Sequence, residues 1–324
     1  MNVFTAQVRA ANRSRDHGSA LLAVYWTLAV LGLTVFGISH FVLDSLEAVN
    51  HRRDDFDARL LAERAIAIAA HPLIQRDDPL LQGDVGEGRA YKATIISEGA
   101  LLNLNAVVLR EQNDVLERLF ASWGMEFTAV ANLISSLQDW VDTDDLVRPG
   151  GAEDRVYEEA GIPGRPFNRP FRSLEEARLV AGMDQLAELR PDWADSFTLW
   201  SGGPLDVSEA EAPLIVAATG APETLAVDLV FTRRGLDGID GTEDDVPLNS
   251  LDSVMAMLQV PEEMALAMAQ RITIDERTTR IVGEGTAHGI TLRQILVLRN
   301  RESRPSLLHF AETRVRNPSL EEGL

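Results

Sequence analysis

The chain has 324 residues, 45% of them hydrophobic, and it contains no cysteine. This length and composition provide for at least one substantial core and about two domains, and they exclude a disordered chain. The 30 basic and 50 acidic residues give a formal net charge of −20, which opposes binding to nucleic acid. Because no disulfide can form, carboxylate-bound calcium is the natural candidate for a stabilising restraint outside the cytoplasm.

The first predicted element is an apolar helix over residues 20–43, which contains only four polar side chains. It is longer than the apolar core of a signal peptide and long enough to cross a bilayer. Arginines precede it and acidic residues follow it, so the short N-terminus should stay in the cytoplasm. We expect the membrane anchor to include Leu21, Leu22, Leu28, Leu31, Leu33 and Phe36.

The small residues Gly18 and Ser19 lie directly before this apolar run. A cut between them would remove a hydrophilic leader and leave the anchor at the new N-terminus. This arrangement resembles type IV prepilins and type II secretion pseudopilins. The resemblance implies that a prepilin peptidase cuts after Gly18 and methylates the new terminal amine. The alternative is an uncleaved signal anchor.

Position five after this cut is Ala23, whereas most pilins have Glu there. A carboxylate in the membrane costs about 2.5–3.5 kcal/mol unless a partner compensates its charge. In those families the partner is taken to be the terminal amine of the subunit ahead in the filament. A subunit at the tip has no subunit ahead of it, so a carboxylate at this position would lack its partner. The absence of Glu at this position therefore resembles the K-type minor pseudopilin of type II secretion.

Helical spacing of apolar residues continues after the anchor and ends at the break made by His71 and Pro72. The stretch that follows predicts one or two strands, with Tyr91, Ala93 and Ile95 on one side. Further amphipathic helices are predicted at Val107–Trp123, Glu126–Trp140 and, after a Ser cap, Ser173–Ala181.

An acidic segment, "DWVDTDDLVRPGGAEDRVYEE", runs from Asp139 to Glu159 and holds eight carboxylates and two arginines. It resembles the "DW-[IV]-D-x-D … GAED-x-x-Y" segment of the K-type pseudopilins. The stretches "LNLNAV" before it and "RPFNRPFRSLEEARLVAGM" after it extend the resemblance over most of residues 101–190. The chain is therefore identified, by resemblance, as a member of that family.

Carboxylates of the acidic segment gather where a helix is expected to end, and calcium binds six to eight such oxygens in flexible geometry. We expect Asp142, Asp144, Glu153 and Asp154 to be ligands, with Asp145 beside them. The alternative is that these carboxylates are solvated and that Glu153 or Asp154 caps a turn.

A second acidic loop, "GLDGIDGTEDDVPLN", contains glycines that allow a tight backbone around an ion. It is not an EF-hand, because its oxygen spacing differs and no glutamate stands at the twelfth position. It is similar to the "DG-x-x-GT-x-DD" calcium loop of the major pseudopilin. We expect calcium here as well, against the alternative of a solvated turn, with ligands Asp237, Asp240, Asp244 and Asp245.

The last part of the chain shows two patterns. The stretches Ala221–Val230 and Val260–Ala269 each place Pro before Glu, which predicts helices with Pro in the first turn. From Ile272 onward, β-branched alternation with Gly-rich turns predicts an antiparallel sheet that closes the fold.

Catalytic motifs are missing from the sequence: there is no nucleophile elbow, no phosphate-binding loop and no histidine set with zinc spacing. Chance pairs of acids such as Asp139 and Glu153 are common in so acidic a chain. We therefore expect a protein that is not an enzyme. The alternative is a membrane-anchored, calcium-stabilised envelope hydrolase or binding module, for which a deep cleft with carboxylates of shifted pKa would be the distinguishing feature.

The predicted fold is of the α+β class, a pilin-like fold made of a long N-terminal helix and an antiparallel sheet, with a large inserted α-helical domain. The expected divisions are a leader at 1–18, a transmembrane stem at 19–44, pilin-like residues 45–100, an inserted helical domain at 101–270 and C-terminal strands and tail at 271–324.

The resemblance implies a minor pseudopilin at the tip of the type II secretion pseudopilus, where it would start assembly for protein export across the outer membrane. It would be a single-pass inner-membrane protein with its C-terminal domain in the periplasm. The implied partners are the I-type and J-type minor pseudopilins, the pseudopilus and the prepilin peptidase.

Overall fold

The computed structural model describes residues 13–240, 242 and 244–315, so the leader residues 1–12 and the tail from residue 316 lie outside the described residues. The chain divides into two compact units, Met1–Asp57 and Ala58–Leu324. A single long helix, α1 (Arg13–Ala69), belongs to both. It ends just before His71 and Pro72, as predicted, because proline cannot continue the hydrogen-bond ladder.

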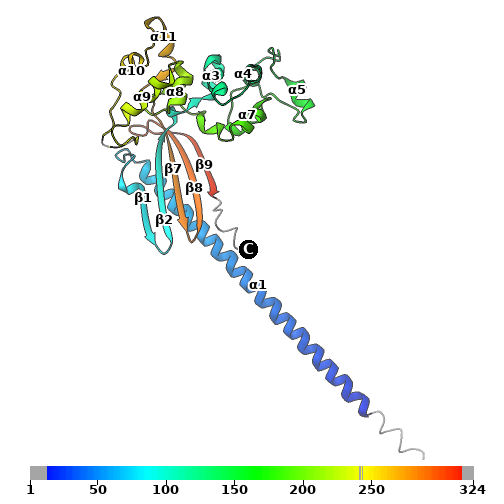
Figure 1. The fold of residues 1–324 in the computed structure, drawn as a ribbon. Coiled ribbons are helices and arrows are strands. Elements are labelled where there is room, and N and C mark those ends of the chain that lie inside the picture. The colour runs from blue at the N-terminus through cyan, green and yellow to red at the C-terminus, as the bar shows by residue number, and fades with distance from the viewer. Residues whose placement is uncertain (1–12, 241, 243, 316–324) are drawn as a thin grey trace, which may run out of the picture. The chain divides into compact units, whose positions relative to one another are not determined.

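A five-stranded antiparallel sheet has the order β1-β2-β7-β8-β9 (Figure 1). Its strands are β1 (Gln82–Gly86), β2 (Arg89–Ser97), β7 (Thr278–Ala287), β8 (Ile290–Arg299) and β9 (Ser306–Val315). Tyr91, Ala93 and Ile95 are buried on one face of β2, which confirms the predicted alternation. The α+β class and the pilin-like combination of helix and sheet are therefore confirmed.

Glycines in β7 let α1 approach the sheet closely. A Cβ atom at Gly285 would lie 2.0 Å from the carbonyl oxygen of Ala58 and 2.4 Å from the backbone nitrogen of Ala62. At Gly283 it would lie 2.8 Å from the carbonyl oxygen of Ala62. The alanines of α1 that face the sheet and the glycines of β7 thus bring two backbones into contact, and the apolar cluster between them closes the first core.

The helical elements lie between β2 and β7 in the sequence and gather at one end of the sheet in Figure 1. The longer ones are α2 (Leu104–Leu109), α3 (Asn113–Ser122), α4 (Phe127–Val141), α7 (Met183–Leu189), α8 (Ala212–Thr219), α9 (Glu223–Arg233) and α10 (Leu251–Met257). The shorter ones are α5 (Asp154–Glu159), α6 (Leu174–Ala177) and α11 (Ala265–Met268). We call this group, residues 98–277, the helical lobe. A second, larger core fills it, with Trp140, Tyr157 and Phe120 among its fully buried side chains.

Short connecting elements complete the helical lobe and its junction with the sheet. The 3-10 turns are Pro79–Leu81, Glu98–Ala100, Trp193–Ser196 and Glu262–Met264. Two small parallel ladders pair β3 (Leu102–Asn103) with β4 (Phe197–Thr198) and β5 (Leu205–Asp206) with β6 (Ile272–Thr273).

Several predicted helices differ in extent from the observed ones. Residues Val107–Trp123 were expected to form one helix, but the chain ends α2 and restarts at α3, with Glu111 between them at a φ of 50°. The cap at Ser173 is confirmed, since its hydroxyl accepts from the backbone N–H of Glu176, but the helix it starts is only one turn long. Pro222 and Pro261 cap their helices from the preceding position instead of occupying the first turn.

The close contact between α1 and β7 gives the first testable prediction. We expect Gly285→Ala to lower the free energy of unfolding by about 1–3 kcal/mol, because the new methyl group must push the two backbones apart. The measurement is denaturant unfolding of the full chain in detergent micelles. Glu284→Ala, a half-exposed neighbour on the opposite face of β7, is the control, and an equal loss in both variants would contradict the close-packing explanation.

Candidate functional site

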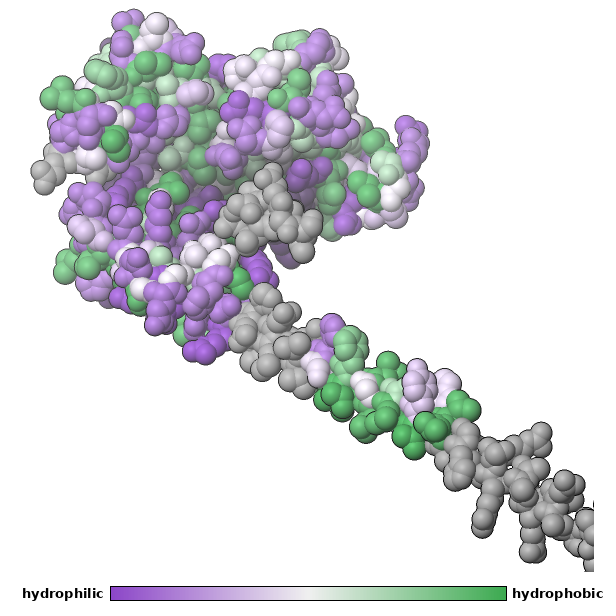
Figure 2. Space-filling model, turned by 60° about the horizontal axis from the view of Figure 1, so that its bottom comes forward, coloured by the Kyte–Doolittle hydropathy of each residue, from purple (hydrophilic) through white to green (hydrophobic). Residues whose placement is uncertain are grey.

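The apolar part of α1 is exposed throughout residues 21–41, where its side chains are described. Leu21–Phe41 form a 21-residue stretch that is long and apolar enough to cross a membrane. The predicted anchor residues Leu21, Leu22, Leu28, Leu31, Leu33 and Phe36 are all exposed, and Figure 2 shows hydrophobic side chains around this section of the helix. The hydroxyls of Thr27 and Thr34 each donate to a carbonyl three residues earlier, at 2.8 Å, so these polar groups are satisfied within the helix, as a bilayer requires.

The predicted processing residues Gly18 and Ser19 lie within the first turns of α1. Their side chains lie outside the described residues, and the prediction that a peptidase cuts between them stays a prediction.

The first acidic segment is organised around Asp139, whose side chain is fully buried at the end of α4. The Arg148 guanidinium donates to it at 2.9 Å and also pairs with Asp142, the C-cap residue of the same helix. The hydrogen bonds and charges of these two aspartates hold the pKa of Arg148 above its ordinary value. At Gly151 a Cβ atom would lie 2.0 Å from a carboxylate oxygen of Asp139, so a side chain here would displace that buried carboxylate.

Glu153 is the unbalanced charge of this segment. Its residue is 5% exposed, and neither carboxylate oxygen has a hydrogen-bond partner among the described residues. Burial raises the pKa of Glu153 to about 7, together with the charges of Asp139, Asp142, Asp145 and Asp144. A group of carboxylates whose charge is only partly neutralised is the environment in which a cation is most strongly attracted.

The other predicted ligands of the first segment lie nearer the surface. Asp144 accepts from the backbone N–H of Leu146 at 2.9 Å, and Asp145 accepts from the side chain of Asn168 at 3.2 Å. Asp154 is exposed in the first turn of α5. Within residues 13–240, 242 and 244–315, no group of three or more His, Cys, Asp or Glu side chains is arranged to hold a metal ion.

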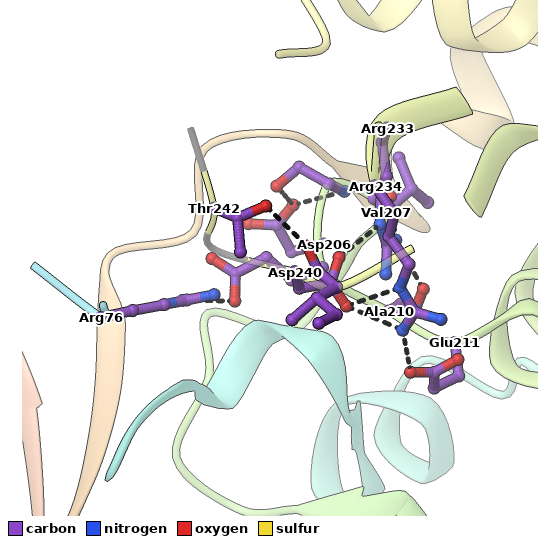
Figure 3. Close-up of polar contacts among 12 residues, drawn as sticks. Arg76, Asp206, Val207, Ala210, Glu211, Arg233, Arg234, Asp240 and Thr242 are labelled. Atoms are coloured by element: carbon purple, nitrogen blue, oxygen red, sulfur yellow. Dashed lines mark hydrogen bonds and ion pairs between the residues drawn. The ribbon is translucent and has the colours of Figure 1, made fainter. Parts of the chain in front are cut away.

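The second acidic loop is held by two arginines at the end of α9 (Figure 3). Arg233 is 3% exposed and donates from Nε to Asp240 at 3.2 Å and from Nη1 to the carbonyl oxygens of Val207 and Ala210. Arg234 donates to the second oxygen of Asp240 at 2.8 Å. Burial raises the pKa of the Asp240 carboxyl, but the hydrogen bonds and charges of the two arginines outweigh it and hold the pKa below its usual value.

The remaining carboxylates of this loop bind its own backbone. Asp244 accepts from the N–H groups of Leu236 at 2.6 Å and Asp237 at 3.1 Å and from the hydroxyl of Thr242. Asp237 in turn accepts from the N–H of Ile239 at 2.8 Å. Asp245 begins the return of the chain toward α10, where the N–H of Val246 donates to the carbonyl of Arg233. The loop is thus closed by its own aspartates.

A cleft of about 1220 Å³ lies between β2 and the helical lobe. Its apolar lining includes Ile96, Trp123 and Leu214. Three of the seven carboxylates that line it are paired with arginines: Glu209 with Arg76 at 2.5 Å, Glu211 with Arg234, and Asp240 with Arg233 and Arg234. Burial raises the pKa of the Glu209 carboxyl. The charge and hydrogen bond of Arg76 offset only part of this effect, so the pKa stays above its usual value.

Sequence reasoning identified the aspartates but missed the arginines that neutralise them. Arg148 follows Asp139 by nine residues, and Arg233 precedes Asp240 by seven. At such spacings the shape of the loop decides whether the two side chains meet, and the sequence does not give that shape. The local signal was the presence of basic residues inside or beside otherwise acidic stretches. Only the fold shows that Arg233 is buried and directed into the loop.

A long helix packed on an antiparallel sheet, with an exposed apolar first half, defines the pilin-like class of proteins. Residues 100–191 match the model of the family described as Type II secretion system (T2SS), protein K. This stretch covers α2 to α7 and includes the first acidic segment.

Two curated relatives and one solved structure agree with this match. The chain is 31% identical over 194 residues to Type II secretion system protein K of Klebsiella pneumoniae, covering 52% of the chain and 59% of the relative. It is 23% identical over 197 residues to that of Pectobacterium carotovorum subsp. carotovorum, covering 53% and 60%. The matches thus span less than two thirds of either relative.

In fold, the chain is similar to a chain of the GspK-GspI-GspJ complex of the enterotoxigenic Escherichia coli type 2 secretion system. The TM-score is 0.64 with 15% identity, over 83% of this chain and 99% of the other. The resemblance to the protein K family of type II secretion, predicted from the sequence, is confirmed.

The pairing of Asp240 gives the second prediction. We expect Asp240→Asn to lower the free energy of unfolding by about 2–3 kcal/mol, because Arg233 stays buried without its carboxylate. Because the folded chain lowers the pKa of Asp240, its stabilisation is fully present above the ordinary value of 3.8 and is lost as the pH falls through the folded value. The variant should lack that acid-dependent loss.

The measurement is denaturant unfolding of the full chain in detergent with a chelator present, at several pH values between 3 and 7. Asp237→Asn, in the same loop but away from the arginines, is the matched control. Equal stability of wild type and Asp240→Asn would show that the arginine pairs do not hold the loop.

Proposed function

We propose that the chain is a minor pseudopilin of the K type, which takes part in assembly of the type II secretion pseudopilus together with the I-type and J-type minor pseudopilins. The observation that carries this proposal is the combination of the pilin-like helix and sheet with a helical lobe that matches the protein K family over residues 100–191. The chain from the GspK-GspI-GspJ complex that shares its fold supports the same assembly.

Two features favour a place at the tip of the filament. Ala23 puts no carboxylate in the apolar stem where most pilins carry one, so the stem has no charge that requires the terminal amine of a subunit ahead. The helical lobe, residues 98–277, adds a second core beside the sheet and makes the subunit bulkier than helix and sheet alone. A lobe of this size would obstruct the stacking of a further subunit.

The apolar stretch Leu21–Phe41 fits a single-pass membrane anchor. We propose that it spans the inner membrane with the N-terminus in the cytoplasm, since arginines precede it and acidic residues follow it. The sheet and the helical lobe would then lie in the periplasm.

Processing at Gly18 gives the third prediction. When the chain is expressed with a prepilin peptidase, we expect mass spectrometry to find a mature form that begins at Ser19 and carries an N-terminal methyl group. Gly18→Val should remain uncut, and Gly32→Val, inside the apolar stretch, is the control that should still be processed. An intact Met1 in the wild-type chain, with the peptidase active on another pseudopilin in the same cells, would contradict the assignment.

A structural role is favoured over catalysis. Three of the cleft carboxylates are each bound to an arginine: the pair of Glu209 and Arg76 joins the helical lobe to the segment before β1, and the pairs of Arg234 with Glu211 and Asp240 lie within the lobe. We therefore propose a protein that acts by assembly and is not an enzyme. The cleft and the raised pKa of Glu209 are features that the hydrolase alternative predicts, but Glu209 is paired with Arg76, whereas that chemistry requires two carboxylates that are free to act as acid and base.

We propose that calcium binds the first acidic segment. The donor set fits the ion. The two buried oxygens of Glu153 have no hydrogen-bond partner among the described residues, and the negative charges of four nearby aspartates act on this carboxylate and raise its pKa. Asp142, Asp144, Glu153 and Asp154 would supply ligands after small shifts of loop side chains, as the flexible coordination of calcium allows. For Asp237, Asp240, Asp244 and Asp245 calcium stays a prediction, since Asp240 is paired with two arginines at the end of α9, and Asp237 and Asp244 accept hydrogen bonds from the loop itself.

The fourth prediction concerns calcium and pH. At pH 8 we expect a chelator to lower the melting temperature of the full chain by roughly 5 °C, and Glu153→Gln to abolish this difference. Glu158→Gln, an exposed neighbour in α5, is the control and should behave as wild type. An unchanged midpoint on chelation would exclude the calcium proposal.

The same variant has an effect without calcium. The folded chain keeps the proton of Glu153 up to about pH 7, whereas the unfolded chain loses it near 4.5. Wild-type stability should therefore fall as the pH rises from about 4.5 to about 7, and Glu153→Gln should be less sensitive to pH over this range. If the stability of the two proteins changed with pH in the same way over this range, the pKa of Glu153 would not be raised in the folded chain.

A further inference from the structure

The outer strand β9 carries large apolar side chains that nothing covers among the described residues. It is an edge strand of the sheet, as Figure 1 shows, and Leu307 and Phe310 are 63% and 51% exposed. The opposite edge, β1, is only five residues long and contains a register shift, as protected edges commonly do. The exposed apolar face of a ten-residue strand is therefore unusual within this sheet.

Strand register shows that Leu307 and Phe310 lie on the same face of the sheet as the side chains that α1 covers. Ile95 pairs with Ile281, Ile281 with Leu296, and Leu296 with Phe310, and paired residues share a face of the sheet. Along this row the side chains pass from buried in β2 and β7 to half-exposed at Phe310. In the neighbouring row Leu298 is buried and its partner Leu307 is exposed.

The width of one helix explains why the row is left uncovered. Residues 58–69 of α1 lie directly over β7, where Gly283 and Gly285 contact the helix backbone. A helix with its side chains is about 10–12 Å across, so it reaches one strand to each side of β7. Strand β9 lies two strands away, at roughly 9.6 Å, beyond that reach. The long Arg59 side chain does cross from α1 to β9, where it pairs with Glu312.

The same distance is the one at which a second helix would pack beside α1. Interaxial distances between packed helices are about 8–10 Å, which equals the separation of β7 and β9. A helix lying along α1 on this side would therefore sit over β9 and cover Leu307 and Phe310. The other face of β9 is already in contact with the helical lobe, because the ring of Trp200 stacks on that of His309 at 4.9 Å.

We propose that Leu307 and Phe310 form a docking surface for the stem helix of a neighbouring minor pseudopilin, which packs beside residues 58–69 of α1. The proposal rests on the proposed function for the identity of the partner, and on the register and helix width for the location. The helix that fits has apolar side chains opposite Leu307 and Phe310 and a polar one opposite the pair of Arg59 and Glu312.

Cysteine cross-linking tests the location directly, because the natural chain has no cysteine. Full-length Phe310→Cys and Thr313→Cys variants are expressed in membranes with tagged I-type and J-type minor pseudopilins, and a photoreactive benzophenone maleimide is attached to the single thiol. The two residues lie on opposite faces of the same strand. We expect a cross-link to a tagged partner from position 310 and several-fold less from position 313.

Each other outcome has a defined meaning. Equal cross-linking from both positions would indicate a strand paired to the edge of β9 and would overturn the proposal. A cross-link to a second copy, or only within the chain to its own segment after residue 315, would also overturn it. If the wild-type chain retains a tagged partner but position 310 reaches none, this inference fails and the proposed function stands. If the wild-type chain retains neither partner, the proposed function fails as well.

Serine substitutions measure how much the surface contributes. We expect Phe310→Ser to reduce the amount of partner retained by the full chain in detergent about tenfold, since burial of the ring is lost. Phe231→Ser, which removes an exposed phenylalanine from α9 in the helical lobe, is the matched control and should retain the partner as wild type does. Equal retention in both variants, with unchanged melting temperatures, would overturn the proposal.

Discussion

The close approach of α1 to β7 is the contact on which the rest of the fold depends. Gly283 and Gly285 remove the side chains that would hold the helix away, and Ala58, Ala62 and Ala65 do the same from the helix. Residues 58–69 of the helix can then pack on the sheet and fill the first core, while residues 21–41 of the same helix remain a predominantly apolar stretch. A bulkier contact would raise the helix above the sheet and leave the first core unfilled.

The helical lobe is inserted without disturbing this contact. Strand β2 ends at Ser97, which pairs with Thr279 at the start of β7, so the chain leaves and re-enters the sheet at neighbouring positions. Glu98, fully buried at this junction, binds Arg280 of β7 and Thr198 of the lobe. One buried carboxylate thus links the two cores, and the sheet keeps its pairing whatever the size of the insertion.

The elements that sequence could predict are those governed by local pattern. The long helix, its end before Pro72, the alternation in β2 and the terminal antiparallel strands follow from periodicity and from the backbone limits of proline and glycine. The sites were harder, because a carboxylate looks the same in sequence whether it binds a cation or an arginine. Asp240 and Asp139 are paired by Arg233 and Arg148, whereas Glu153, two residues after Gly151, is buried without a hydrogen-bond partner among the described residues. Only burial and direction, which depend on the tertiary fold, separate these cases.

The proposed tip position and the uncovered face of β9 follow from the same limit of one helix per sheet. A single helix covers at most three of the five strands, so this chain keeps an apolar margin on β9, which a neighbour's helix would complete in the proposed assembly. That margin lies on the same face of the sheet as residues 58–69 of α1, whereas the helical lobe occupies the end of the sheet, as Figure 1 shows. A subunit built in this way offers apolar contacts along its side and a bulky, strongly acidic segment at its end. Lateral contacts with blocked stacking are what a filament needs at a position where growth starts and beyond which no subunit is added.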